Sequence, residues 1–292
     1  DTPPRVRNSN ALTSIYSTRS SLETPLLMAN GSGAQLMDAQ PYVRNVPGGN
    51  INSGMLYHTL NEENDGILAT KNYDNVPWCA PICCCFVKKN NLKEGTVYLQ
   101  VSRGVAERSF DFPNSSNDFT VTAFTQSKDL INNKSALQGI SVMTIEDNRW
   151  GRCDIKTVQL LYPSYAKFTA AQEGFDDAWM VRNGHVTEGT SNNAWIIRNG
   201  TVITRQADNL ILKGITREAV AECAKELNYK IDYNNFTVNE AQNASEAFIT
   251  SATTFVTPVI KINNAIISDG IPGKFTQLLR EKYIEKARKI AI

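Results

Sequence analysis

The sequence has few histidines, almost no net charge and no long apolar run. Only His58 and His185 occur in 292 residues, which leaves little for a histidine-based metal site. The 30 Lys and Arg residues balance 29 Asp and Glu residues, so nothing favours a nucleic-acid partner. No apolar stretch reaches the roughly 20 residues of a membrane span, and the N-terminal residues lack a signal peptide's apolar core. We therefore expect a cytoplasmic globular protein with no membrane partner.

Cysteine is also scarce and unevenly placed. Of six cysteines, four lie between Cys79 and Cys85, and the others are Cys153 and Cys223. Zinc ligands usually come as spaced pairs from separate segments, and no second pair or histidine cluster follows this group. We therefore predict no metal site and interpret the cysteines as reduced thiols.

Hydrophobic periodicity is clear from about residue 86 onward. Alternating residues predict strands over 96–103 and 119–124, and Ile140 to Ile145 resembles another strand. Three Asn-containing pairs predict hairpins, because residues in such tight turns adopt positive φ: Asn183-Gly184, Asn199-Gly200 and Asn263-Asn264. The composition predicts a helix over 157–171. The spacing predicts a helix over 217–228 with Thr216 as its N-cap, and a last helix over 274–289.

These elements predict two domains of α/β (α+β) class. Residues 1–128 would form a small N-terminal domain, whose first 85 residues show little clear pattern. The polar residues 129–137 would form a linker. Residues 138–292 would form a larger domain of antiparallel hairpins and packed helices.

Three features carry possible chemistry. Gly214-Ile215-Thr216 stands at a helix start, where free N–H groups and the helix dipole favour an anion such as phosphate. Taken alone, each feature is better explained without a ligand. An ordinary capped helix explains the glycine segment, a turn explains Glu188, and a surface charge explains Lys156. Together they match the needs of pyridoxal 5′-phosphate (PLP): an amine for the imine, a carboxylate for the ring nitrogen and a phosphate cradle.

Several ordered motifs resemble the class IV aminotransferases, which are the fold-type IV PLP enzymes. Glu188, Thr190, Asn193 and Trp195 follow the family pattern, with Trp195 standing where Phe or Tyr is usual. The pattern continues in Val202-Ile203-Thr204 and in Leu212 to Arg217. Arg149 to Lys156 resembles the segment that ends in the Schiff-base lysine, and Phe248 to Thr254 resembles a second phosphate loop. The resemblance covers roughly residues 86 to 290.

The resemblance implies a two-domain fold-type IV enzyme that acts as a homodimer. Lys156 would be catalytic and hold the cofactor, and Glu188 would keep its ring nitrogen protonated. The other implied cofactor-binding residues are Ser191, Asn192, Gly214, Ile215, Thr216, Ala252 and Thr253. The reaction would be ping-pong transamination between an amino acid and a 2-oxo acid, with 2-oxoglutarate as the expected acceptor.

The segment from Arg103 to Pro113 resembles D-amino-acid transaminases. Arg108 matches the arginine that binds the substrate α-carboxylate, a role suited to the planar guanidinium fork. Phe110 replaces a histidine that usually assists it, and Tyr42 lies at the distance of the family's active-site tyrosine. Residues 1–85 lack the motif that supplies the phosphate-binding arginine.

Other functions share these motifs. Branched-chain L-amino-acid transaminases, (R)-amine transaminases and aminodeoxychorismate lyase use the same lysine, glutamate and phosphate loops, although the Arg108 segment favours D-amino acids. A non-enzymatic alternative is a structural homologue that binds no cofactor.

Overall fold

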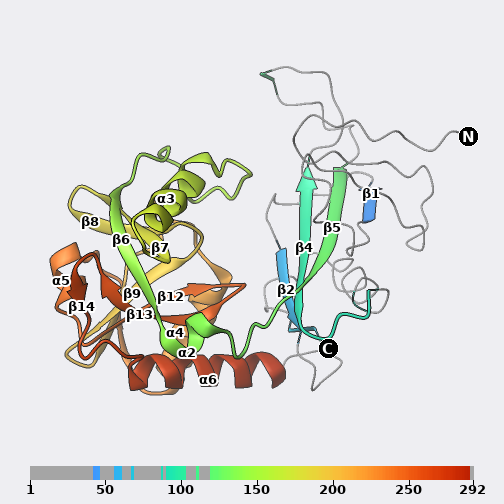
Figure 1. Cartoon of the computed structure of the whole chain (residues 1–292). Coiled ribbons are helices and arrows are strands. Elements are labelled where there is room, and N and C mark those ends of the chain that lie inside the picture. Colours follow the sequence, from blue (N-terminus) through green and yellow to red (C-terminus); the bar gives the residue numbers. More distant parts are fainter. Residues whose placement is uncertain are drawn as a thin grey trace, which may run out of the picture. The chain divides into compact units, whose positions relative to one another are not determined.

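The computed structural model describes residues 42–46, 56–60, 67–68, 87, 90–102, 110–111 and 119–289. In five of these stretches, 42–46, 56–60, 67–68, 101–102 and 119–121, it describes the backbone alone. The chain forms two compact units, one of residues 1–128 with 291–292 and the other of residues 129–290 (Figure 1).

The first unit contains an antiparallel sheet in the order β1-β5-β4-β2-β3. Its strands are β1 (Tyr42–Val46), β2 (Leu56–Leu60), β3 (Ile67–Leu68), β4 (Gly95–Ser102) and β5 (Phe119–Ser127). Val97 and Leu99 of β4 are fully buried on one face, as the alternation of apolar residues predicts. On β4 and β5, Tyr98 and Phe124 stack with ring centroids 4.7 Å apart.

The second unit is built on a mixed sheet in the order β11-β10-β9-β12-β13-β6-β7-β8, with β14 paired to β13. Strands β13 and β7 both run parallel to β6, which lies between them. Strand β12 pairs antiparallel with β9 on one side and with β13 on the other. The strands are β6 (Ile140–Glu146), β7 (Asp177–Arg182), β8 (His185–Gly189), β9 (Asn193–Arg198), β10 (Thr201–Thr204), β11 (Lys230–Asp232), β12 (Glu246–Ser251), β13 (Phe255–Ile262) and β14 (Ala265–Ile266).

Side chains on the central strands alternate between two apolar layers. Trp195 and Ile197 of β9 face the layer that contains the long helices α4 (Ile215–Glu226) and α6 (Lys274–Lys289). Ala194 and Ile196, one residue out of step, face a second layer with the short helix α5 (Val238–Gln242). This period of two explains why the four inner residues of β9, Ala194 to Ile197, are all apolar: both faces of the strand are buried there.

The predicted hairpins are confirmed. The turn between β7 and β8 has φ of 52° at Asn183 and 77° at Gly184, and the turn between β9 and β10 has 50° at Asn199 and 70° at Gly200. The β13–β14 turn follows the same rule at Asn263, where φ is 52°. Asparagine and glycine are the residues that tolerate this left-handed conformation at least cost.

Two helices begin elsewhere than the sequence predicts. Helix α3 (Leu161–Gln172) begins four residues after the predicted start at 157. Pro163 lacks an N–H and therefore fits only the first turn of a helix. Helix α4 begins at Ile215, so Gly214 is its N-cap and the predicted Thr216 cap is wrong. Helix α6 spans the predicted residues 274–289.

A buried arginine ties α6 to two other segments of the second unit. Arg280 donates to the carbonyl oxygens of Thr254 and Val256, both at 2.8 Å, at the start of β13. It also donates to the carbonyls of Leu130 and Ile131, at 2.8 and 2.9 Å. These two carbonyls lie in the predicted linker, which also holds most of the short helix α2 (Lys134–Gln138). Burial lowers the pKa of Arg280 to about 10, so it stays charged at neutral pH.

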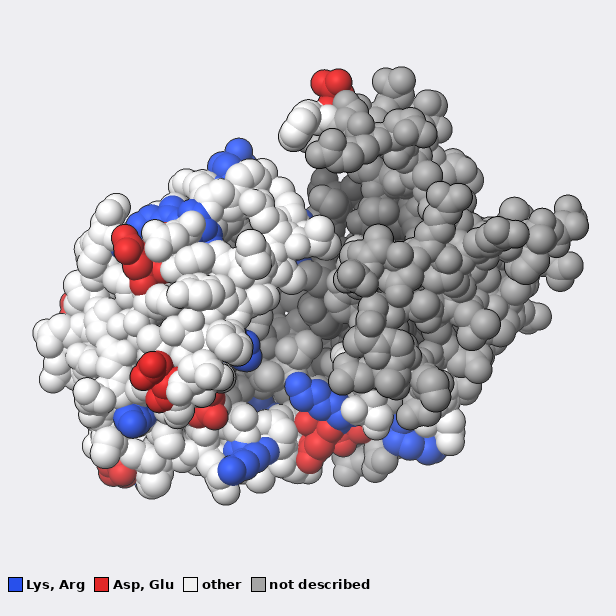
Figure 2. Space-filling view, turned by 45° about the horizontal axis from the view of Figure 1, so that its top comes forward, with Lys and Arg blue, Asp and Glu red and all other residues white. Residues whose placement is uncertain are grey.

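Charge on the second unit is mixed in sign. Figure 2 shows basic and acidic side chains interspersed on the face in view, with broad uncharged areas between them. Among the described residues no helix is long and apolar enough to cross a membrane. The same part of the chain contains no cluster of three or more histidine, cysteine, aspartate or glutamate side chains suited to a metal ion.

Candidate active site

Glu188 lies near the end of β8 and is almost completely buried, at 5% relative exposure. Its Oε1 accepts a hydrogen bond from Nη1 of Arg149 at 2.6 Å, and its Oε2 accepts one from Nδ2 of Asn193 at 2.9 Å. The backbone N–H of Leu212 is shared between both oxygens, at 3.2 and 3.1 Å. Burial raises the pKa of Glu188 to about 7, and Arg149 opposes that rise.

The carboxylate of Glu188 is held by donors from three described residues. A carboxylate offers about four acceptor positions. Among the described residues three donors use them: Arg149, Asn193 and the N–H of Leu212. The N–H of Leu212 is shared between both oxygens, so each oxygen has two donor contacts, and the two contacts with Leu212 are the longest of the set. A buried carboxylate held in this way is a suitable acceptor for the single N–H of a protonated pyridine ring.

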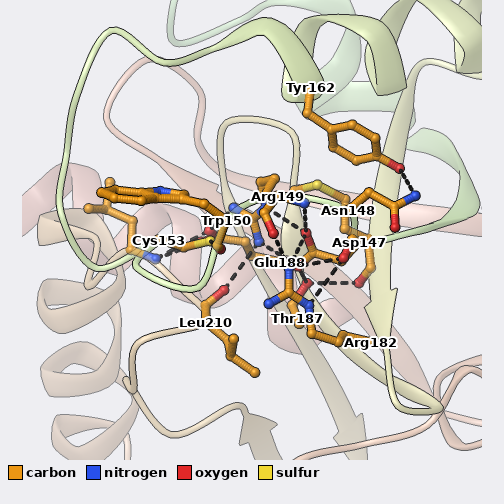
Figure 3. Close-up of polar contacts among 12 residues, drawn as sticks. Asp147, Asn148, Arg149, Trp150, Cys153, Tyr162, Arg182, Thr187, Glu188 and Leu210 are labelled. Atoms are coloured by element: carbon orange, nitrogen blue, oxygen red, sulfur yellow. Dashed lines mark hydrogen bonds and ion pairs between the residues drawn. The ribbon is translucent and has the colours of Figure 1, made fainter.

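Arg149 comes from the segment that follows β6 and stands between two carboxylates (Figure 3). Its Nε and Nη2 donate to the two oxygens of Asp147, at 2.9 and 2.8 Å, while Nη1 reaches Glu188. Nη2 also donates to the carbonyl of Leu210 at 3.2 Å, which joins this segment to the strand-to-helix connection before α4. The side chain of Asp147 is fully buried and that of Arg149 is 11% exposed.

Lys156 ends this segment and is half-buried. Burial lowers the pKa of its amine, and the nearby negative charge of Glu188 opposes the decrease. The loop before it is anchored: the N–H of Cys153 donates to Asn209 at 2.8 Å, and Nδ2 of Asn209 donates to Gly151 at 2.7 Å. A lysine with a lowered pKa is neutral more often, which is the form that attacks a carbonyl carbon.

The start of α4 lies beside Glu188. Asn193, which binds Glu188, also donates from Nδ2 to the carbonyl of Leu212 at 2.8 Å. A Cβ added to Gly214 would stand 2.3 Å from Oδ1 of Asn193, so only glycine fits there. Thr216, on the first turn, is 2% exposed, and the described part of the chain offers its hydroxyl no hydrogen-bond partner. A buried hydroxyl beside free helix N–H groups is suited to a phosphate.

The predicted second phosphate loop connects β12 to β13. Its residues Ala252 and Thr253 lie in a turn, next to Ser251, whose hydroxyl bonds to that of Thr254 at 2.8 Å. The register pairs Thr250 with Asn193, so this turn follows the strand beside the one that contributes Asn193. Trp195, the departure from the family pattern, donates to Thr250 Oγ1 at 2.9 Å and stacks on Phe248.

The structure brings several predicted residues together and leaves others aside. Glu188 and the start of α4 meet through Asn193 and Leu212, and Lys156 lies within the electrostatic influence of Glu188. Ser191 is exposed, while the amide of Asn192 donates to Asp177 at 2.7 Å. The cofactor contacts of Ser191 and Asn192 therefore stay predictions.

Two substrate-site predictions cannot be placed. Arg108 lies outside the described residues. Tyr42 begins β1 opposite Ala123, but its side chain is outside the described part of the chain.

Arg149 and Asn193 are functional candidates that the sequence analysis did not assign to the site. Asn193 stood in the family pattern, and Arg149 opened the lysine segment, so both were visible as motif positions. Neither carries a signal that names its partner. Arg149 and Glu188 are 39 positions apart, and only the folded sheet shows that they meet.

The close approach of Asn193 to Gly214 can be tested by mutation. We expect Gly214→Ala to displace Asn193 and loosen its bonds to Glu188 and Leu212, because the backbone φ of −68° suits alanine and only the space is lacking. The affinity for PLP should fall by about 10- to 150-fold, equivalent to about 1.5–3 kcal/mol for a hydrogen bond to a charged group. Equilibrium titration of the cofactor-free protein measures it.

Gly151→Ala is the matched control, because a Cβ at Gly151 meets nothing within 4 Å. Equal affinities of the Gly214 variant and the wild type would show that the close approach to Asn193 is unimportant.

The residues present fit PLP. An amine of lowered pKa, a buried carboxylate and a buried hydroxyl at a helix N-terminus correspond to the aldehyde, ring nitrogen and phosphate of that cofactor.

Comparison with known proteins agrees with this chemistry. The model of the family "Amino-transferase class IV" matches residues 79–262. A D-alanine aminotransferase of Staphylococcus aureus (strain N315) is 39% identical over 202 residues, covering 68% of this chain and 71% of that protein. The D-alanine aminotransferase of Listeria monocytogenes serotype 4b (strain F2365) is 37% identical over 205 residues, covering 68% and 70%.

Solved structures show the same fold. The branched-chain amino acid aminotransferase of Thermobaculum terrenum, solved in its PLP-bound holo form, has a TM-score of 0.64 at 19% identity, covering 81% of this chain and 84% of that one. The enzyme from Escherichia coli has a TM-score of 0.66 at 17% identity, covering 89% and 91%. The predicted fold-type IV architecture is thereby confirmed. From the family match and the close relatives together, the chain belongs to the class IV aminotransferases.

Proposed function

We propose that this aminotransferase uses PLP to move the amino group of D-amino acids to a 2-oxo acid, with 2-oxoglutarate as acceptor. The observation that carries the proposal is the convergence of Lys156, Glu188 and the start of α4 in one unit. The D-alanine aminotransferases at up to 39% identity favour D-amino acids among the substrates of the family.

Each site residue has a distinct task in this proposal. PLP, when bound, supplies an aldehyde and an electron-withdrawing ring. Lys156 holds the cofactor through its amine and, once released by substrate, moves the proton from the substrate α-carbon. Glu188 accepts the ring N–H. The free N–H groups at Ile215 and Thr216, the Thr216 hydroxyl and the turn at Ala252 and Thr253 bind the phosphate.

The chirality of the donor tests the proposal directly. Mixing the holoenzyme with D-alanine or D-glutamate, without acceptor, should convert the cofactor absorbance to that of the aminated form and release a 2-oxo acid. L-leucine and simple primary amines should react far more slowly. A faster reaction with L-leucine would instead assign the chain to the branched-chain enzymes whose fold it shares. No absorbance change with any donor would support the non-enzymatic alternative.

Arg108 is proposed to bind the substrate α-carboxylate. We expect Arg108→Met to weaken D-alanine and D-glutamate by similar factors of about 10- to 150-fold, because both lose the same charge-assisted pair. Reaction with a primary amine, which has no carboxylate, should be unchanged. Saturation curves of the half-reaction measure both. If D-amino acids bind equally well to the variant, the carboxylate is recognised elsewhere.

We also propose a homodimer, with helix α3 at the contact. Its small residues Ala166 and Ala170 pack on the sheet, whereas Leu161, Tyr165 and Phe168 share one outer face and are 85%, 55% and 63% exposed. Large apolar residues on an outer helix face are typical of surfaces that bind a second copy. Light scattering should give twice 32.4 kDa. Leu161→Lys with Phe168→Lys should give the monomer, and an unchanged dimer would place the contact elsewhere.

A further inference from the structure

Arg149 is clamped by Asp147 and presents one nitrogen to Glu188. Two guanidinium nitrogens bind the two oxygens of Asp147 side by side, at 2.9 and 2.8 Å, and the backbone N–H of Arg149 adds a third bond to the same carboxylate at 3.1 Å. This fork leaves Nη1 as the nitrogen that contacts Glu188, at 2.6 Å (Figure 3). Paired bonds of this kind fix the plane and direction of an arginine.

Asp147 is itself held from other elements. Its Oδ2 accepts from the hydroxyl of Thr187 on β8 at 2.8 Å, and its Oδ1 lies 3.2 Å from Nη2 of Arg182 on β7. Its backbone N–H donates to the carbonyl of Val181 at 2.8 Å. The clamp on Arg149 is therefore built from the protein alone and needs no ligand to form.

We propose that Arg149, oriented by Asp147, is a positioning residue that keeps Glu188 ionised, so that the proton shared between Glu188 and the cofactor ring stays on the ring nitrogen. The inference rests on the proposed use of PLP, and deepens it: Arg149 acts through Glu188 and reaches neither substrate nor cofactor in this role.

The charges around Glu188 explain why it needs such a partner. Burial alone favours the neutral acid, and Asp147 adds a like charge nearby. Two cations oppose this: Arg149 in direct contact and Lys156 at longer range, while the carboxylate paired with Arg182 is that of Asp147. Lys156 provides no constant charge, because its amine would be consumed in forming the imine and must be neutral to act as a base. Arg149 is thus the one cation among the described residues that contacts Glu188 and keeps its charge throughout.

The consequence for the cofactor follows from hydrogen-bond chemistry. An ionised Glu188 can only accept, so the ring nitrogen must carry the proton. A protonated Glu188 donates instead and leaves the ring nitrogen without its charge, which weakens the ring as an electron sink. Loss of Arg149 should raise the pKa of Glu188 further and shift this balance toward the neutral acid.

The proton on the ring nitrogen can be observed directly. In the holoenzyme reconstituted with PLP labelled with nitrogen-15 in the ring, nuclear magnetic resonance at about pH 7.5 should show a protonated nitrogen in the wild type. Arg149→Gln should shift the signal toward the unprotonated form. Arg149→Lys, which keeps the charge, should restore most of the wild-type signal, and Asp147→Asn should give an intermediate shift because Arg149 loses its clamp.

Arg152→Gln is the matched control. Arg152 stands three positions further along the same segment and also binds an aspartate, Asp154, but this pair is exposed. The Arg152→Gln variant should therefore leave the nitrogen-15 signal of the cofactor ring unchanged. A wild-type signal in Arg149→Gln, or an equal shift in Arg152→Gln, would overturn the proposal.

A measurement without cofactor separates this inference from the proposed function. Infrared spectroscopy of the cofactor-free full chain can follow the carboxyl band of Glu188, identified by its absence in Glu188→Gln. Arg149→Gln should raise the pKa of Glu188, so that half of the carboxyl groups are ionised at a proton concentration at least tenfold lower than in the wild type. If PLP does not bind at all, the proposed function fails while this titration still tests Arg149. An unmoved titration would refute the role of Arg149 even in an active enzyme.

Discussion

Replacing Lys156 by alanine is expected to abolish transamination, with a loss of at least about 10²- to 10⁴-fold, because the same amine attaches the cofactor and transfers the proton. The fold should survive, since Lys156 is half-buried and lies in a loop whose anchors are Cys153 and Asn209. Two measurements check this: single-turnover kinetics with D-alanine and the absorbance of the bound cofactor, which should resemble free PLP.

An exposed lysine serves as the control for that experiment. Lys225 lies on the last turn of α4 and faces solvent, so Lys225→Ala should keep both the absorbance and the rate. Circular dichroism should give the same spectrum for both variants and the wild type. If Lys156→Ala turned over D-alanine at the wild-type rate, the assignment of the catalytic amine would be wrong.

Glu188→Gln is expected to retain PLP but to slow removal of the α-proton. The amide keeps the shape of the side chain and loses the charge that holds the ring N–H. The loss corresponds to one charge-assisted hydrogen bond, about 1.5–3 kcal/mol, or about 10- to 150-fold in the single-turnover rate. Rapid mixing with D-alanine, with and without deuterium at the α-carbon, isolates this step. An unchanged rate would show that Glu188 is structural only.

The same variant has a signature in the cofactor-free protein. The folded pKa of Glu188, about 7, lies above its ordinary value of 4.5, so the folded state binds the extra proton between these two values. The contribution of Glu188 to the free energy of unfolding is therefore highest below about pH 4.5. It falls as the pH rises to about 7, by up to about 3 kcal/mol. Glu188→Gln should remove that decrease. Urea unfolding at both ends of the range compares the two proteins.

The sequence by itself determined the elements that local rules govern. The Asn183-Gly184 and Asn199-Gly200 turns depend only on which residues tolerate positive φ. Helix α6 follows from its own apolar spacing, and β4 from alternation. The order of the motifs around Lys156 and Glu188 was also enough to indicate the family and its cofactor.

The tertiary structure alone decided which side chains meet. Asn193 joins Glu188 to the start of α4 because it begins β9, and from there its side chain contacts both Glu188 on β8 and the carbonyl of Leu212 before α4. Helix α4 begins at Ile215, so the buried hydroxyl of Thr216 has no hydrogen-bond partner among the described residues, where a local rule had predicted a cap. The Arg149 contact with Glu188 likewise requires β6, β7 and β8 to pair in order. Such contacts depend on strand order and burial over tens of residues, which a window of sequence does not contain.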